Sequence, residues 1–403
     1  MFKNYFITAI RSLHKNKLFA IVNILGLSLS MCVCLVALLQ IKDAFTYDNF
    51  HPFPKRSFRV ITDITGENGI RDRWATSPPP LADRLSSLYP FVEKTVHVTP
   101  AMDEELQADQ KKIQLKISYT EPAFFDIFGF NLVVGNKRDA LAQPNSIVLT
   151  SKAAELFFPG ENPLGKNLSI KNASGNYVIT GILKDSQEKT HLITDAFVSF
   201  SSLEFNNHSE NLADEWKKYS HSSTYVLLRE NAPVASLEKA LSTISLQNAA
   251  LFQLKNISRL TYDYQRLDRI SPGEDLILGG NYKSANSLWI ISGITFLILL
   301  MACFNYTNLS LARSLSRARE VGVRKAMGGS KRQLFYQFVT ESVTVSLLAL
   351  TFACWLLFVL MKLPAMHERQ LNGIRLDLSA VCWFVVFAVL TGIMAGALPA
   401  AVL

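Results

Sequence analysis

Four stretches of the chain are apolar over a length that can cross a membrane. None of them contains Asp, Glu, Lys or Arg, and they occupy Leu18–Ile41, Ser284–Ala312, Ser342–Met361 and Leu378–Leu403. A helix needs roughly 20 residues to span about 30 Å of hydrocarbon, and every stretch reaches that length. The pattern predicts a multi-pass α-helical membrane protein with transmembrane helices at 18–41, 286–312, 342–361 and 378–403.

The first stretch is not typical of a signal peptide. Its apolar core is longer than the roughly 7–15 residues of a signal sequence. The residues after it, QIKDAFTYD, offer no small-residue cleavage site. We therefore interpret it as an uncleaved membrane anchor.

Residues 42–285 show the mixed periodicity of a large α+β domain. Apolar residues at 113, 115, 117 and 119 alternate with polar ones, which predicts a half-buried strand. Further strands are predicted at Phe58–Ile64, Ser146–Thr150, Tyr177–Leu183 and Thr224–Arg229. Helices are predicted at Leu81–Tyr89, at Lys152–Phe158 with Ser151 as its N-cap, and at Val234–Leu251.

The charges predict an orientation for the membrane helices. The 403-residue chain has a net charge of +8, yet residues 42–283 hold 27 bases and 29 acids. The excess lies beside the spans, because residues 1–17 hold four bases and no acid and residues 313–341 hold seven bases and two acids. Short loops rich in Lys and Arg remain in the cytoplasm. We therefore expect 1–17 and 313–341 inside, and the domain at 42–285 and a short loop at 362–377 outside.

The composition agrees with a few spanning helices joined to a water-exposed domain. Hydrophobic residues make up 49% of the chain, and its mean hydropathy is +0.17. The cysteines all lie in the apolar stretches, at Cys32, Cys34, Cys303, Cys354 and Cys382. Neither a disulfide framework nor a metal site with zinc-ligand spacing is therefore predicted.

The motifs of several enzyme and transporter classes are missing. Residues 160–167, GENPLGKN, resemble a phosphate-binding loop, but Asn167 replaces the Ser or Thr that holds Mg²⁺. A predicted helix also precedes this turn and a strand follows it, which reverses the required order. Neither G-x-S-x-G nor H-E-x-x-H occurs, and the seven scattered histidines are predicted mostly at the surface or in turns. The apolar stretches hold no ionisable residue, which disfavours ion- or proton-coupled transport.

The N-terminal residues 1–17 are predicted to form an amphipathic helix. Phe2, Phe6, Ile10 and Leu13 fall on one helical face, with the bases largely on the other. Such a helix lies at the inner membrane surface. The alternative is a simple basic flank that only sets the topology.

A second helix is predicted in the basic segment after the second span. Gly328 and Gly329 supply the left-handed residue that ends a helix, and Ser330–Gln333 matches a capping box that opens the next. The helix would present Arg319, Glu320, Arg324 and Lys325 to a cytoplasmic partner. The alternative is a solvated basic flank. Nucleic-acid binding is not expected, because the segment is short, tethered at both ends and without an aromatic platform.

Several of these segments together resemble one family. RSLSRAREVGVRKAMGGSKRQLFYQFVTES is similar to the segment after the second span in FtsX-like/MacB-like permeases of ABC transporters. MFKNYFITAIRSLHKNKLFAIVNILGLSLS is similar to their N-terminus. YDNFHPFPKRSFRV, ATSPPPLADRLSSLYP, FFDIFGF, PNSIVLTSKAAELFFPGENPLGKNL and VITGILKD resemble their periplasmic core domain. The resemblance thus covers nearly the whole chain.

The resemblance implies a non-catalytic permease subunit without a cofactor of its own. A separate ABC-type ATPase would bind ATP and Mg²⁺, and its motion would be passed to the periplasmic domain, which is termed mechanotransmission. The coupling residues carried over by position are Arg317, Arg319, Glu320, Val321, Gly322, Arg324, Lys325 and Gly328. The family also implies the cell inner membrane with its lipid, a second permease copy or half, and a periplasmic partner.

Two other functions stay open at this point. One is a membrane-anchored extracytoplasmic ligand sensor without transport, and the other is a membrane-anchored exterior enzyme. The chain is expected to be either a four-helix permease that dimerises, as a homodimer or heterodimer, or part of a longer eight-helix one. The residues do not identify the substrate.

Overall fold

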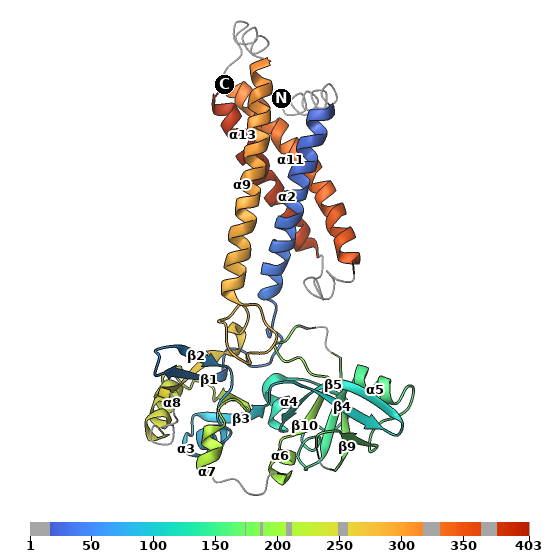
Figure 1. Ribbon diagram of the computed structural model, residues 1–403, viewed down its shortest axis with the longest axis vertical. Helices are drawn as coiled ribbons and strands as arrows, with labels where there is room; N and C mark the ends of the chain where they lie inside the picture. Colours follow the sequence, from blue (N-terminus) through green and yellow to red (C-terminus); the bar gives the residue numbers. More distant parts are fainter. Residues whose placement is uncertain are drawn as a thin grey trace. The chain divides into compact units, whose positions relative to one another are not determined.

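The computed structural model describes residues 17–173, 175–185, 188–206, 212–248, 257–316, 331–363 and 377–402. The chain divides into two compact units (Figure 1). One consists of Met1–Asp43 and Ser287–Leu403 and is helical, whereas Ala44–Asn286 forms a domain of strands and helices. The predicted fold class, four membrane helices with a large mixed domain between the first and second, is confirmed.

Four long helices form the described part of the helical unit. They are α2 (Lys17–Ala44), α9 (Ala285–Ser316), α11 (Lys331–Lys362) and α13 (Leu378–Val402). The segments long and apolar enough to cross a membrane are Ala20–Ala44, Ala285–Asn308, Phe335–Lys362 and Leu378–Ala397. The third segment includes Glu341, which the charge pattern had assigned to the connector before the span.

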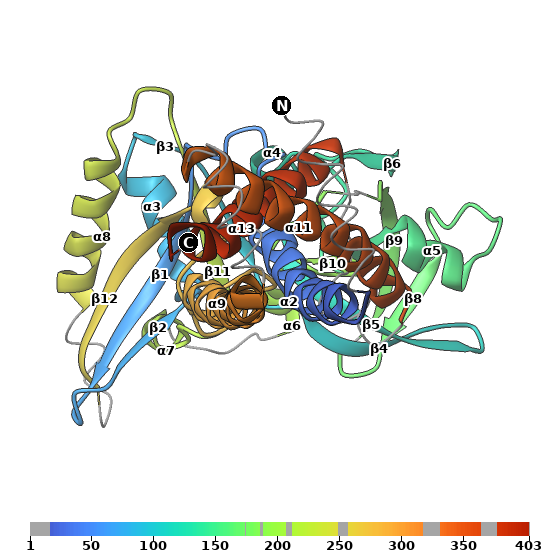
Figure 2. The ribbon, with the colours of Figure 1, turned by 90° about the horizontal axis from the view of Figure 1, so that it is seen from above.

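Small residues allow α11 and α13 to pack closely (Figure 2). A Cβ atom added to Gly392 would lie 2.6 Å from the Cα of Val343, and one added to Gly396 would lie 2.5 Å from the Ser342 hydroxyl oxygen. Glycines four residues apart are typical of close helix contacts in membranes. Only glycine at both positions permits this approach of the two backbones.

The apolar face of α2 completes the core of the helical unit. Met31 and Leu35 are fully buried in a cluster with Ala353 and Leu357 of α11 and Ala388 of α13. These side chains are separated by three or four residues along each helix, so each helix contributes one continuous stripe. The helical unit is therefore held together by packing of apolar stripes.

The described residues of the domain form one mixed sheet of twelve strands. In spatial order the strands run β10-β7-β9-β8-β4-β5-β3-β11-β1-β12, with β2 beside β1 and β6 beside β9. Their bounds are β1 Ser57–Gly66, β2 Arg71–Trp74, β3 Val92–Val98, β4 Met102–Ala108, β5 Lys111–Thr120, β6 Leu132–Gly135, β7 Ser146–Thr150, β8 Asn167–Ile170, β9 Asn176–Leu183, β10 Ala196–Ser199, β11 Ser223–Leu228 and β12 Ile257–Arg266.

Short helices cover this sheet over three adjoining apolar cores. They are α3 Pro80–Leu88, α4 Ala123–Phe128, α5 Ser151–Phe157, α6 Ser201–Asn206, α7 Leu212–Lys217, α8 Val234–Asn248 and the 3₁₀ helix η2 Leu267–Arg269. One core lies under α3 and α8 on β1, β11 and β12, and a second lies under α5 on β4 to β10. The third is built around the aromatic side chains of α4.

The N-cap of α5 corrects one prediction. The structure places Thr150, not Ser151, at this position, because Thr150 has an extended backbone with φ −66° and ψ 157°. Its hydroxyl oxygen accepts a hydrogen bond from the Ala153 N–H at 3.2 Å, as N-caps do. The Ser151 hydroxyl instead donates to the Leu183 carbonyl at 2.9 Å, which ties the helix to β9.

The GENPLGKN segment is a turn between α5 and β8, as predicted. The Asn162 side chain accepts a hydrogen bond from the Leu164 N–H at 3.1 Å, and Lys166 pairs with Glu161. Both charged groups lie at the exposed turn. The order helix, turn, strand is thus the reverse of a phosphate-binding loop.

Candidate functional site

Two linkers join the domain to the membrane helices along the chain. The incoming linker, residues 45–56, follows α2, and the outgoing linker, residues 270–284, precedes α9. Each contains a non-glycine residue in the left-handed region, Asp48 with φ 57° and Leu278 with φ 56°. Such backbone costs energy and persists only where the surroundings hold it in place. The contacts around these residues therefore define the candidate site.

Asp48 is the centre of a buried polar cluster in the incoming linker. Its Oδ1 lies 3.0 Å from the Nε2 of His51, and its Oδ2 lies 3.0 Å from the Nδ1 of His191. The backbone N–H of His191 also faces both carboxylate oxygens, at 3.2 and 3.3 Å. None of the three side chains is more than 1% exposed. Asp48 thus joins the incoming linker to a loop far along the chain.

His51 connects Asp48 to the backbone of α4. Its Nδ1 lies 2.7 Å from the Phe128 carbonyl oxygen, and its Nε2 faces the Asp48 carboxylate. A carbonyl and a carboxylate only accept hydrogen bonds, so both ring nitrogens of His51 are placed to donate. Burial would raise the pKa of Asp48, but its contacts with His191 and His51 outweigh burial and hold that pKa below its usual range.

The surroundings of His191 favour its neutral form. Burial lowers its pKa, and the nearby charges of Arg59 and His51 act in the same direction against the attraction of Asp48. Its Nε2 lies 2.6 Å from the Tyr225 hydroxyl, and burial raises the pKa of Tyr225 to about 12. Tyr225 therefore donates to Nε2, and the proton of His191 sits on Nδ1. The Nδ1 contact with Asp48 is close but is not aligned as a hydrogen bond.

The outgoing linker is bound to the same loop. The Asn281 N–H donates to the His191 carbonyl at 2.9 Å, and the Asp48 N–H donates to the Lys189 carbonyl at 2.9 Å. Gly280 has φ 87°, and a Cβ there would lie only 2.6 Å from the His191 carbonyl oxygen. One short loop, residues 189–191, therefore holds both linkers.

A buried arginine adds a second connection to the outgoing linker. Arg59 of β1 is 1% exposed, and its guanidinium donates to the Gly279 carbonyl at 2.7 Å and to the Gln265 amide oxygen at 2.6 Å. Its Nε has no hydrogen-bond partner among the residues that the structure describes. We call Asp48, His51, Arg59, His191, Gly280 and Asn281 the linker clamp.

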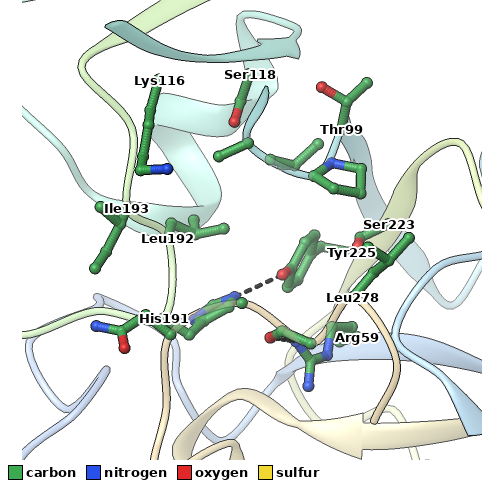
Figure 3. Close-up of a pocket in the computed structure, with 16 residues that line it drawn as sticks. Arg59, Thr99, Lys116, Ser118, His191, Leu192, Ile193, Ser223, Tyr225 and Leu278 are labelled. Atoms are coloured by element: carbon green, nitrogen blue, oxygen red, sulfur yellow. Dashed lines mark hydrogen bonds between the residues drawn. The ribbon is translucent and has the colours of Figure 1, made fainter. Parts of the chain in front are cut away.

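A cavity of about 400 Å³ lies against the clamp (Figure 3). Arg59, His191 and Tyr225 line it on one side, and Lys116 and Ser118 of β5 line it across from His191. The cavity is of the size that small-molecule sites have in proteins, about 300–1,000 Å³.

A second cavity of about 670 Å³ shares the wall formed by Thr99, Pro100, Ala101 and Leu278. His97 lines it, with its Nδ1 2.6 Å from Glu121 and its Nε2 2.8 Å from the Pro79 carbonyl oxygen. Burial opposes a charge on His97, but the hydrogen bond and charge of Glu121, with the Pro79 carbonyl, raise its pKa.

The predicted coupling residues lie outside the described part of the chain. Arg317, Arg319, Glu320, Val321, Gly322, Arg324, Lys325 and Gly328 all fall within residues 317–330, and residues 1–16 are likewise outside it. The structure therefore leaves both predictions untested. Among the described residues, no group of three or more His, Cys, Asp or Glu side chains could hold a metal ion.

The prediction that most histidines lie at the surface or in turns is wrong for His97, which is buried in β3, whereas His51 and His191 lie in bends but are buried. His51, His97 and His191 are each at most 3% exposed. The available signal was Asp48-x-x-His51 directly after the first span, where a polar residue and an imidazole stand among aromatic ones. His191 and Arg59 carried no comparable signal, because their partners are distant in sequence.

Two family models match the chain. Residues 20–244 match the MacB-like periplasmic core domain, and residues 292–403 match the FtsX-like permease C-terminal region. A curated relative, the macrolide export ATP-binding/permease protein MacB of Hahella chejuensis, is 24% identical over 324 residues, which cover 77% of this chain and 44% of that protein. The matched part of the chain spans less than half the length of this relative and of two further MacB proteins.

Two solved structures are similar to the chain. A domain of a permease protein from Porphyromonas gingivalis shows 22% identity and a TM-score of 0.46, covering 60% of this chain and 98% of that one. The periplasmic region of MacB from Actinobacillus actinomycetemcomitans shows 16% identity and a TM-score of 0.38, covering 53% of this chain and 90% of that one.

Proposed function

The chain belongs to the ABC-transporter permeases that have a MacB-like periplasmic core domain and an FtsX-like C-terminal region. We propose that it transmits ATP-driven motion from a separate cytoplasmic ATPase to the periplasmic core domain. It is a multi-pass membrane protein, and its charge pattern supports an inner-membrane location with the domain in the periplasm. The ATPase would bind ATP and Mg²⁺, and the permease would need no cofactor and perform no catalysis.

The linker clamp is the observation that carries this proposal. The two linkers are continuous in sequence with α2 and α9, and the loop 189–191 binds both of them. Breaking a buried ion pair by removing one partner costs about 3–5 kcal/mol. A pull on either linker is therefore expected to displace the loop and the sheet behind it before the clamp opens.

The input to this mechanism is proposed at residues 317–328. This segment follows α9 in the chain and precedes α11, so a force on it acts on both helices. Arg324 and Lys325 would pair with acids of the ATPase, and Glu320 with a base. Truncating one side of a desolvated interface pair costs about 2–5 kcal/mol, whereas an exposed pair contributes about 0–1 kcal/mol.

A charge reversal tests the proposed input. Glu320→Lys combined with Arg324→Glu should leave membrane insertion of the permease intact. It should lower the stimulation of the ATPase by the permease and uncouple ATP hydrolysis from transport. The matched control is Glu368→Lys with Arg369→Glu in the loop predicted outside, which should change none of these. Thiol cross-links between residues 317–327 and the ATPase should form in the wild type. Normal transport by the first double variant, without any cross-link, would contradict the proposal.

The ligand-sensor alternative is supported by the cavities in the domain. A sensor without transport predicts that the full chain purifies without a cassette ATPase under conditions that keep membrane complexes intact. A permease predicts stable co-purification. This single comparison separates the two functions. The second permease copy and a periplasmic partner belong to the permease proposal and would be detected in the same purification.

A further inference from the structure

We propose that the cavity beside the linker clamp binds a small organic carboxylate, a monoanion with an apolar body. This site goes beyond the transmission of motion and does not depend on it. The inference comes from the charge of the cavity lining, the buried arginine and the apolar walls.

The lining favours a negative charge. Among the sixteen lining residues are the cations Arg59 and Lys116, and none is Asp or Glu. Within the described part of the chain, no carboxylate lies within 4.0 Å of the Arg59 guanidinium, and its Nε is without a partner. A buried cation balanced only by neutral oxygens is costly, and an anion in the adjoining space would offset that cost.

One negative charge fits this lining better than two. The Lys116 amine already contacts both Asp103 oxygens, at 3.0 and 3.1 Å, so Arg59 supplies the uncompensated positive charge. The neighbouring imidazole of His191 is fully buried, and burial lowers its pKa and disfavours a positive charge there. A carboxylate therefore matches the site, whereas a phosphate dianion would bring a charge that nothing in the lining balances.

The remaining walls explain the apolar body of the ligand. Val98, Leu192, Ile193 and Leu278 line the same cavity. Figure 3 shows Lys116, Ser118 and Thr99 on the side opposite Arg59 and His191. The wall shared with the second cavity gives room for a longer apolar chain. Apolar walls with a few placed polar groups are typical of small-molecule sites.

Binding is tested with the full chain in lipid nanodiscs by isothermal titration calorimetry. The probes are hexanoate, hexanol, hexylamine and hexyl phosphate, which share one chain and differ in charge. Hexanoate should bind saturably, and the other three should bind roughly tenfold or more weakly, as expected when a charged hydrogen bond is lost. Equal binding of hexanol or hexylamine, tighter binding of hexyl phosphate, or no saturable binding of a carboxylate would overturn the proposal.

A second pair of probes distinguishes the source of the carboxylate. An N-acetylated valine dipeptide is titrated as the free acid and as the amide. Binding of the free acid alone indicates the C-terminus of an apolar peptide, and binding of hexanoate without the dipeptide indicates a fatty acid. Both results support a carboxylate site. Equal binding of the acid and the amide would contradict it.

Two variants connect binding to this cavity. Arg59→Gln should weaken hexanoate binding roughly tenfold or more, and Arg59→Lys should retain most of the binding because the charge remains.

Arg59 also holds the outgoing linker, so Ala101→Trp provides an independent test from an exposed position in the shared wall. Its indole should obstruct the cavity. Ala235→Trp, on the exposed side of α8, is the matched control and should bind like the wild type. Unchanged binding in folded Arg59→Gln and Ala101→Trp proteins would overturn the assignment.

Discussion

His191 in the linker clamp and His97 in the second cavity are both buried beside a carboxylate, yet their pKa values shift in opposite directions. His97 has Glu121 at 2.6 Å on one nitrogen and the Pro79 carbonyl on the other, so both partners favour the cation. His191 shares Asp48 with His51, and its other nitrogen accepts from a tyrosine hydroxyl. Its burial and the charge of Arg59 then keep it neutral.

The comparison shows that burial alone does not set the charge of an imidazole. The deciding factors are what the second ring nitrogen contacts and whether the carboxylate is shared. In the clamp, Asp48 is shared by His51 and His191, and His191 positions the loop. In the second cavity, the raised pKa of His97 favours its protonated form.

Removing the shared carboxylate should have the largest effect. Asp48→Ala leaves His51 and His191 buried without the carboxylate that they share, and we expect a loss of about 3–5 kcal/mol in the free energy of unfolding of the domain. Denaturation followed by the fluorescence of Trp74 and Trp216 measures it.

The matched control for Asp48→Ala removes an exposed carboxylate. Asp126→Ala breaks a pair with Lys94 in which the two side chains are 53% and 41% exposed. This change should cost about 0–1 kcal/mol. Equal losses of unfolding free energy in Asp48→Ala and Asp126→Ala would show that the buried contacts of Asp48 stabilise the domain no more than an exposed ion pair does.

Filling the close approach at Gly280 should have the next largest effect. Gly280→Ala places a Cβ 2.6 Å from the His191 carbonyl oxygen in a residue with φ 87°. Gly69→Ala is the control, since Gly69 has φ 75° and nothing within 4 Å. The control should cost about 1–2 kcal/mol for the backbone alone, and Gly280→Ala should cost measurably more. Identical unfolding midpoints would show that the loop and the outgoing linker are not tightly held.

The two histidines should produce smaller effects with opposite pH dependence. The folded pKa of His97 is raised, so its stabilising contribution is complete below about pH 6.5 and is lost as the pH rises through the folded value. The folded pKa of His191 is lowered, so its contribution is present above about pH 6.5 and is lost as the pH falls below it.

Unfolding measured between mildly acidic and mildly alkaline pH distinguishes the two sites. The stability difference between wild type and His97→Gln should shrink as the pH rises, while the difference for His191→Gln should grow. Parallel curves for the two variants would remove the contrast between the clamp and the second cavity.

The exposed turn should have the smallest effect of all. Lys166→Ala removes a partner of Glu161 at the surface and should leave the unfolding midpoint close to that of the wild type. The purified chain should not bind a fluorescent ATP analogue with or without this change. Nucleotide binding that disappears in Lys166→Ala would contradict a turn without phosphate-binding function.

The parts of the fold that were predictable depend on local patterns. Runs of apolar residues identified the four spans, and alternation of apolar and polar residues identified strands such as β5. The flanking residues identified the helix–turn–strand order around 160–167. The clamp depends on contacts that no local pattern encodes, since Asp48 and His191 are 143 positions apart. The close contact of Gly392 with Val343 likewise requires knowing which helices pack together.

The central claim is that ATP-driven motion reaches the domain through the linker clamp. Hydrogen–deuterium exchange of the full chain, reconstituted in nanodiscs with its ATPase, tests this directly. Three amides report on the clamp: Asp48 donates to Lys189, His191 faces Asp48, and Asn281 donates to His191. We predict that their protection changes between the nucleotide-free and ATP-trapped states, and that Glu320→Lys with Arg324→Glu abolishes the change. Identical exchange at all three amides while the ATPase turns over would contradict the account.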